Sequence, residues 1–168
     1  MDDEIDGLRT TLAGLTEEQA RATPTASALS VGGVVKHVTF GLVGARERIA
    51  SAPEPSAWDA DFDARVADWT DSFALRDDET VEGTLASFDE AFTTLKAQCQ
   101  GLDLGSVCNY PAQPWFGQPA ADVSIRWVLL HIFAEVAHHA GHADIVRETL
   151  DGTTTDTRMG VEWEPDES

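Results

Sequence analysis

Residues 124–150 read SIRWVLLHIFAEVAHHAGHADIVRETL, and this stretch decides the predicted fold. At about 100° per residue its apolar side chains fall on one stripe, which predicts a single long amphipathic helix packed into a helical bundle. The stripe consists of Ile125, Val128, Leu129, Ile132, Val136, Ala143, Val146 and Leu150. Four of the chain's five histidines also lie here, so we expect the chemistry of the protein on this helix.

The helical wheel separates the ionisable side chains of this helix. His139 falls well inside the apolar stripe and Glu135 at its edge, whereas His131 and His142 lie further out and His138 faces solvent. Glu135 and His139 are four residues apart on one face, a spacing at which a carboxylate and an imidazole can hold one divalent ion. Two alternatives stay open from the residues alone: His138 with His142 is a rival pair, and histidines here could simply serve packing and surface roles.

Three further helices are predicted upstream, over residues 3–15, 29–50 and 78–100, with a short helical turn beginning at Thr16. Together with 124–150 they predict an all-α four-helix bundle. Two long irregular connections, 51–78 and 102–122, join the last three helices, and no segment shows a convincing strand pattern. The first connection has room for a short helix or for a segment that covers the bundle. Tyr110 and Trp115, in the second, could line the mouth of a site.

The predicted helix 29–50 carries the remaining histidine, His37, on the flank of its apolar stripe. Gly33, Gly41 and Gly44 fall on the same side as His37. A glycine inside a helix costs about 1 kcal/mol relative to alanine, so three of them need a reason. Close helix packing and room for a ligand beside the imidazole are both open.

Composition limits the classes of function. Thirty acidic residues against eleven basic ones give a formal net charge of −19, which disfavours binding to DNA or RNA. The sequence has no signal-peptide pattern and no apolar run near the ~20 residues of a membrane span, so we expect a cytoplasmic protein. Cys99 and Cys108 are expected to be reduced thiols, although one disulfide between them is left open. We expect one bundle domain over 1–152 and a polar, acidic tail over 153–168.

From roughly Leu8 to Gly152 the order of these features resembles the DinB-like superfamily of metal-dependent enzymes. The most specific segments are LSVGGVVKHVTFG at 29–41 and RWVLLHIFAEVAHHAGHADIVRETLDG at 126–152, the second of which resembles an actinobacterial branch of the superfamily. The resemblance implies a four-helix bundle of up-down-down-up order that is often a homodimer.

The resemblance also implies a metal site. Carried over position by position, the ligands of the superfamily fall on His37, Glu135 and His139. Many members have a histidine at position 135, while the related mycothiol-dependent maleylpyruvate isomerase is similar to this chain in using His, Glu and His. Zinc is the expected ion, with nickel, iron or manganese as alternatives. The candidates for the rest of the site are His131, His138, His142, Tyr110 and Trp115.

Three protein ligands leave one coordination position open, as in catalytic zinc sites. Two neutral imidazoles and one carboxylate would leave a net charge of +1, which favours a thiolate. We therefore expect a metal-dependent transferase or isomerase that uses a low-molecular-weight thiol of the mycothiol or bacillithiol type. The expected partners are a small-molecule substrate and this thiol, with no nucleic acid and no membrane. The alternatives are a non-catalytic, metal-stabilised binding module and a metal-dependent hydrolase.

Overall fold

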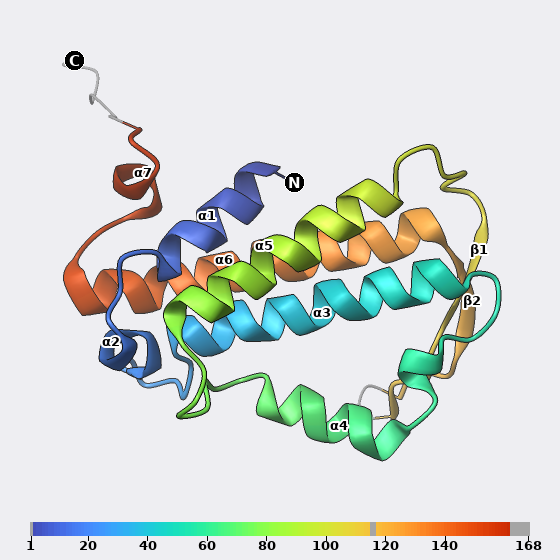
Figure 1. Cartoon of the computed structure of the whole chain (residues 1–168), viewed down its shortest axis with the longest axis horizontal. Coiled ribbons are helices and arrows are strands. Elements are labelled where there is room, and N and C mark those ends of the chain that lie inside the picture. The colour runs from blue at the N-terminus through green and yellow to red at the C-terminus, as the bar shows by residue number, and fades with distance from the viewer. Residues whose placement is uncertain (1, 115–116, 162–168) are drawn as a thin grey trace.

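A bundle of four long helices forms the body of the chain in the computed structural model, which describes residues 2–114 and 117–161. The helices are α1 (Asp2–Leu12), α3 (Val31–Ser51), α5 (Val81–Gln98) and α6 (Ile125–Asp151). Helices α1 and α6 run in one direction and α3 and α5 in the other, so the expected up-down-down-up order is present (Figure 1). The most extensive packing joins α3 to α5 and to α6, and α1 to α6.

Side-chain caps fix where the helices begin. Ser30, Thr80 and Ser124 accept hydrogen bonds from backbone N–H groups in the first turns of α3, α5 and α6, which would otherwise lack partners. Because Thr80 caps α5, this helix begins at Val81, three residues later than predicted. The first helix ends at Leu12, earlier than predicted, and Thr16 then begins α2 (Glu17–Arg21) with a capping box.

The core lies between the four helices and follows the predicted stripes. The largest fully buried side chains include Leu8, Leu12, Val34, Val35, Leu42, Phe88, Leu95, Val128 and Val136. Each comes from a position that recurs every three or four residues along its helix, as expected for one buried face. The stripe on α6 therefore faces the bundle, with His139 largely buried and Glu135, at the edge of the stripe, about half-exposed.

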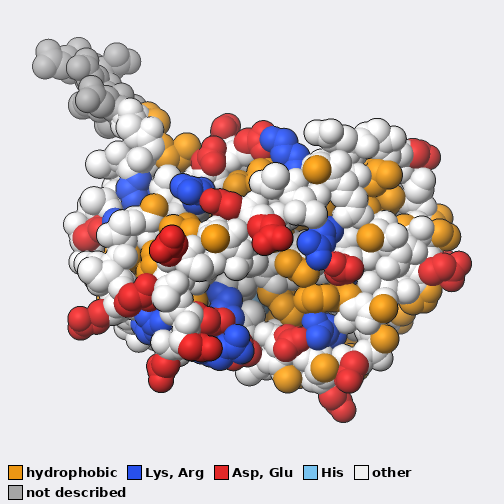
Figure 2. Space-filling model, in the orientation of Figure 1, with side chains coloured by type: hydrophobic (Ala, Val, Ile, Leu, Met, Phe, Trp, Pro, Cys, Tyr) orange, Lys and Arg blue, Asp and Glu red, His pale blue; other side chains and the backbone are white. Residues whose placement is uncertain are grey.

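The first long connection covers one side of the bundle. Because α3 and α5 run in the same direction, the chain must return along the bundle between them, and it does so through the 3₁₀ helix η1 (Ala57–Asp59) and α4 (Phe62–Asp71). Both possibilities left open by the sequence are thus realised: the connection contains a helix, and it covers the bundle. On the face drawn in Figure 2, hydrophobic side chains gather between α4 and the bundle.

The second long connection is not wholly irregular, contrary to the prediction. Strands β1 (Val107–Tyr110) and β2 (Ala121–Ser124) pair antiparallel, with Val107 opposite Ser124 and Tyr110 opposite Ala121. Strands of four residues are too short to show a clear alternation, and the proline-rich loop between them carries no two-residue hairpin signal. The pairing holds Tyr110 beside α6.

The predicted polar tail begins with the short helix α7 (Thr155–Arg158), which packs on α1. Arg158 forms an ion pair with Asp144 of α6. The rest of the tail, 162–168, lies outside the described residues. Among the described residues, no helix has the length and apolar character needed to cross a membrane.

Candidate functional site

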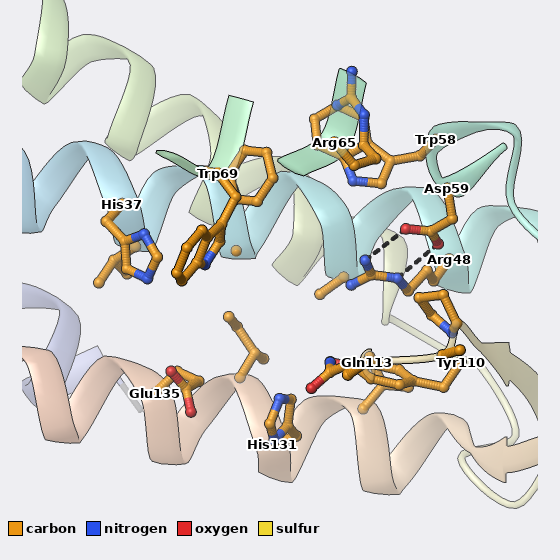
Figure 3. A pocket seen from close by; sticks show the side chains of 18 of the residues that line it. His37, Arg48, Trp58, Asp59, Arg65, Trp69, Tyr110, Gln113, His131 and Glu135 are labelled. Carbon is orange, nitrogen blue, oxygen red and sulfur yellow. Dashed lines mark hydrogen bonds and ion pairs between the residues drawn. The ribbon is translucent and has the colours of Figure 1, made fainter. Parts of the chain in front are cut away.

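A cavity of about 390 Å³ lies between α3, α6, the returning α4 segment and the end of β1 (Figure 3). Its walls combine aromatic and aliphatic side chains, and most of its polar side chains lie toward its two ends. His37, Glu135 and His139 line one end. Thus the structure brings the three residues singled out from the sequence to one pocket, although His37 is nearly a hundred residues away from the other two.

The hydrogen bonds of His37 define which ring nitrogen is free. Its Nδ1 lies 2.8 Å from the Ser72 Oγ, and that hydroxyl donates its own proton to the Trp69 carbonyl oxygen at 2.6 Å. The Ser72 oxygen must therefore accept from the Nδ1–H of His37. This tautomer leaves Nε2 with a lone pair, which is the arrangement typical of a histidine that binds metal.

Burial keeps the His37 ring neutral. Desolvation, followed by the nearby His139, lowers the pKa of His37 to about 4. Phe73 stacks on the ring with a centroid separation of 4.1 Å, and Trp69 contacts it edge-on at 6.2 Å. His37 is therefore uncharged near neutral pH, as metal ligation requires.

Of the two explanations left open above for the glycines of α3, the structure supports close packing. A Cβ on Gly33 would lie 2.1 Å from the Phe73 carbonyl oxygen, so this glycine permits the close approach of the segment that holds Ser72. Gly41 lines the cavity, and a Cβ on Gly44 would lie 3.2 Å from both Arg48 Nη1 and Trp58 Nε1. A Cβ on Gly41 would lie 3.0 Å from Ile132 Cδ1, so all three glycines permit close packing of the segments around α3.

Glu135 and His139 face His37 from α6. The His139 Nε2 lies 3.6 Å from the Glu135 Oε2, and the rings of His37 and His139 have centroids 4.9 Å apart. His139 lowers the pKa of Glu135, and this effect outweighs the opposite effect of burial. The His139 Nδ1 is buried and, among the described residues, has no hydrogen-bond partner.

The residues at this end have donor chemistry that fits a divalent ion. Two imidazole rings, on His37 and His139, are borderline donors, and the carboxylate of Glu135 is a hard one; this combination suits zinc and its neighbours. In the described part of the chain, no group of three or more His, Cys, Asp or Glu side chains is already drawn together as a ligand set. The structure therefore supplies the donors without showing a metal centre.

The other histidines of α6 fall into two groups. His131 lines the cavity and stacks on Trp127, with centroids 5.0 Å apart and an interplanar angle of 10°. The rings of His138 and His142, the rival pair, have centroids 4.4 Å apart, and neither residue lines the cavity. Burial, followed by its histidine neighbours, lowers the pKa of His142. Tyr110 lines the cavity as predicted, whereas Trp115 lies outside the described residues.

Sequence reasoning missed the opposite end of the pocket. There the Arg48 guanidinium donates to both carboxylate oxygens of Asp59, at 2.8 and 2.7 Å, and Gln113 Nε2 donates to the Tyr110 hydroxyl at 3.1 Å. Burial raises the pKa of Tyr110, so its hydroxyl keeps its proton. Asp59 and Gln113 stand in connections without any motif, and nothing in their local sequence indicates that they meet.

Neither cysteine belongs to the site. Cys108 is buried in β1 and its thiol lies 3.4 Å from the Arg48 carbonyl oxygen, while Cys99 is half-buried at the end of α5. Both are free thiols, as expected. Burial raises the pKa of each, which disfavours the reactive thiolate.

An up-down-down-up bundle whose second and last long helices present His37, Glu135 and His139 to one pocket defines a DinB-like protein. The chain belongs to the mycothiol-S-transferase family, whose sequence model matches residues 1–152.

A solved structure supports the fold. The chain is similar to a conserved protein from Enterococcus faecalis, with a TM-score of 0.57 and 18% identity over 90% of this chain and 93% of that one. Comparison with curated protein sequences gave no match.

Proposed function

We propose that this protein is a metal-dependent transferase that joins a low-molecular-weight thiol of the mycothiol type to an electrophilic small molecule. The observation that carries the proposal is the His37 ring, whose Nδ1 is held by Ser72 and whose centroid lies 4.9 Å from that of His139, at the pocket end that Glu135 also lines. Membership of the mycothiol-S-transferase family supports the identity of the thiol.

His37, Glu135 and His139 would hold the ion, with zinc expected and nickel, iron or manganese as alternatives. When bound, such an ion would act as a Lewis acid that lowers the pKa of a thiol and stabilises the thiolate. The protein's own contribution is positioning. Ser72 fixes the tautomer of His37, and Trp69 and Phe73 shield the imidazole from water.

In the proposed reaction the thiolate sulfur forms a bond to an electrophilic carbon of the substrate. The thiol proton leaves to solvent, and the substrate either expels a leaving group or takes up a proton after addition. If the sulfur is later eliminated, the same site performs an isomerisation in which the thiol is regenerated. The aromatic walls would hold the apolar part of the electrophile.

Metal content is the first test. We expect about one divalent ion per chain in untagged wild type and in His138→Ala, whose side chain lies outside the pocket, and a large loss in Glu135→Ala. Conjugation of mycothiol to a fluorogenic electrophile should follow the metal content. Absence of the ion from wild type supplied with zinc would overturn the proposal. A full ion content without conjugation of any thiol would favour the metal-stabilised binding module, and ester hydrolysis instead would favour the hydrolase.

A further inference from the structure

The pocket is long, and its two polar ends are far apart. His37 and Arg48 both line it from α3 and are eleven residues apart, which corresponds to roughly 16 Å along a helix. Figure 3 shows His37 and Glu135 at one end, and Arg48, Asp59, Tyr110 and Gln113 at the other. A cysteine-sized thiol at His37 would leave the far end empty, so the pocket is shaped for a longer molecule.

The far end is polar but carries no net charge. Arg48 and Asp59 form a bidentate pair, with only 16% and 14% of their side chains exposed. Arg65, the other arginine in the described lining, pairs with Asp68 at 2.5 Å and lies 4.2 Å above the Trp58 ring. Since both cations are already neutralised and the chain has a net charge of −19, the far end favours a neutral ligand over a phosphate or a carboxylate.

The far end also presents donors and acceptors side by side. The hydroxyl of Tyr110 accepts from Gln113 Nε2 and can donate its own proton, while the Gln113 amide oxygen and the Asp59 carboxylate can accept further hydrogen bonds. Trp58, Phe40 and the Tyr110 ring add apolar faces. Hydroxyl groups, each of them both donor and acceptor, on a saturated ring with an apolar face match this combination.

We propose that Arg48, Asp59, Tyr110 and Gln113 form a subsite for a neutral polyhydroxylated ring, the sugar-like or inositol-like part of the thiol cosubstrate. Its sulfur would then extend along the pocket to His37, Glu135 and His139. The placement of the sulfur rests on the proposed function, whereas the affinity of the far end for a polyol does not. The subsite would select a large glycosidic thiol over small thiols.

The test measures binding of three uncharged probes by calorimetry: mycothiol, N-acetylcysteine as its neutral amide, and glucosaminyl-inositol whose amine is acetylated in place of the thiol arm. The variant is Tyr110→Phe/Gln113→Leu, which removes hydrogen bonds and keeps side-chain volume, and the control is His138→Ala. We expect the double variant to weaken mycothiol and glucosaminyl-inositol at least tenfold and to leave N-acetylcysteine unchanged. Thermal midpoints within a few degrees of wild type would show that the variant is folded.

The outcomes separate the subsite from the proposed reaction. Unchanged affinity for glucosaminyl-inositol in the double variant, or equal binding of mycothiol and N-acetylcysteine by wild type, would overturn the subsite even if conjugation proceeds. An increased KM for the electrophile with an unchanged KM for mycothiol would also overturn it, because the far end would then bind the second substrate. Loss of glucosaminyl-inositol binding in the variant would support the subsite even if no conjugation is found in wild type.

Discussion

The free nitrogen of His37 depends on a chain of two hydrogen bonds. The Trp69 carbonyl takes the Ser72 proton, and Ser72 in turn accepts from His37 Nδ1–H. Partners of this kind orient a metal-binding imidazole and make it a better donor. Ser72, which is not among the residues that line the cavity, thereby determines which ring nitrogen of His37 keeps its lone pair.

Replacing Ser72 with alanine should weaken metal binding. The Nδ1–H would lose its acceptor and the ring could rotate or change tautomer, so we expect a drop of about 10–100-fold in affinity for zinc, measured by competition with a chromophoric chelator. Thr70→Ala is the control, because its hydroxyl bonds to a carbonyl of the same helix at an exposed position. Equal zinc affinities in wild type and Ser72→Ala would contradict this role.

The sequence alone predicted which side chains of α6 share a face, because the helical period depends only on the spacing of residues along the helix. Glu135 and His139 share a face in any α-helix, and their side chains do lie together. The metal they are predicted to hold stays a prediction. The pairing of Arg48 with Asp59, by contrast, has no local signature.

At the scale of elements, the pocket exists because α4 and the segment after it approach α3 closely. The two segments meet at Gly33, where a Cβ would clash with the carbonyl oxygen of Phe73. The backbone at that point belongs to the connection between α3 and α5, so a side chain there would displace the segment that carries Ser72. The glycine is thus a determinant of the site as well as of packing.

Gly33→Ala should therefore destabilise the protein although alanine is the better helix former. We expect the free energy of unfolding in urea to fall by about 1–3 kcal/mol, the usual cost of forcing an extra methyl group into a packed interior. Gly141→Ala on α6 is the matched control, because nothing lies within 4 Å of its Cβ. That variant should be neutral or gain up to about 1 kcal/mol. If Gly33→Ala were stabilised as well, the prediction would be wrong, and the segment around Phe73 would be able to move away from the added methyl group.

The β1–β2 hairpin and α4 are the elements that the sequence described least well. Both lie in connections whose short, irregular stretches give weak periodicity. The structure of both elements depends on the segments they pack against. In α4, for example, the aromatic side chains do not form a regular stripe but point toward the pocket. The four bundle helices were predictable because each buries one continuous face.

At the scale of the whole molecule, the net charge of −19 opposes the compact state. Acidic side chains are spread over the face drawn in Figure 2, with basic ones beside several of them. Ion pairs such as Arg9–Asp89 and Lys96–Asp2 lie on exposed surfaces and contribute little individually. Self-repulsion should therefore outweigh these pairs at low ionic strength.

Adding salt should stabilise the protein. The screening length falls from about 30 Å at 0.01 M to about 8 Å at 0.15 M, which removes long-range repulsion more than it weakens contact pairs. We expect the thermal midpoint to rise by about 2–4 °C for each kcal/mol of repulsion relieved, measured in sodium chloride. A midpoint that falls with salt would mean that the surface ion pairs dominate.

The sequence by itself determined the helical class and the face shared by Glu135 and His139, because helix caps and apolar period are properties of neighbouring residues. The up-down-down-up order of the bundle came from the family resemblance. The resemblance of two segments was enough to add His37 to that pair. Only the tertiary structure decided the tautomer of His37, the length of the pocket and the meeting of Arg48 and Asp59 with Tyr110 and Gln113. These depend on contacts between segments far apart in the chain, and such contacts are set by how the connections pack on the bundle.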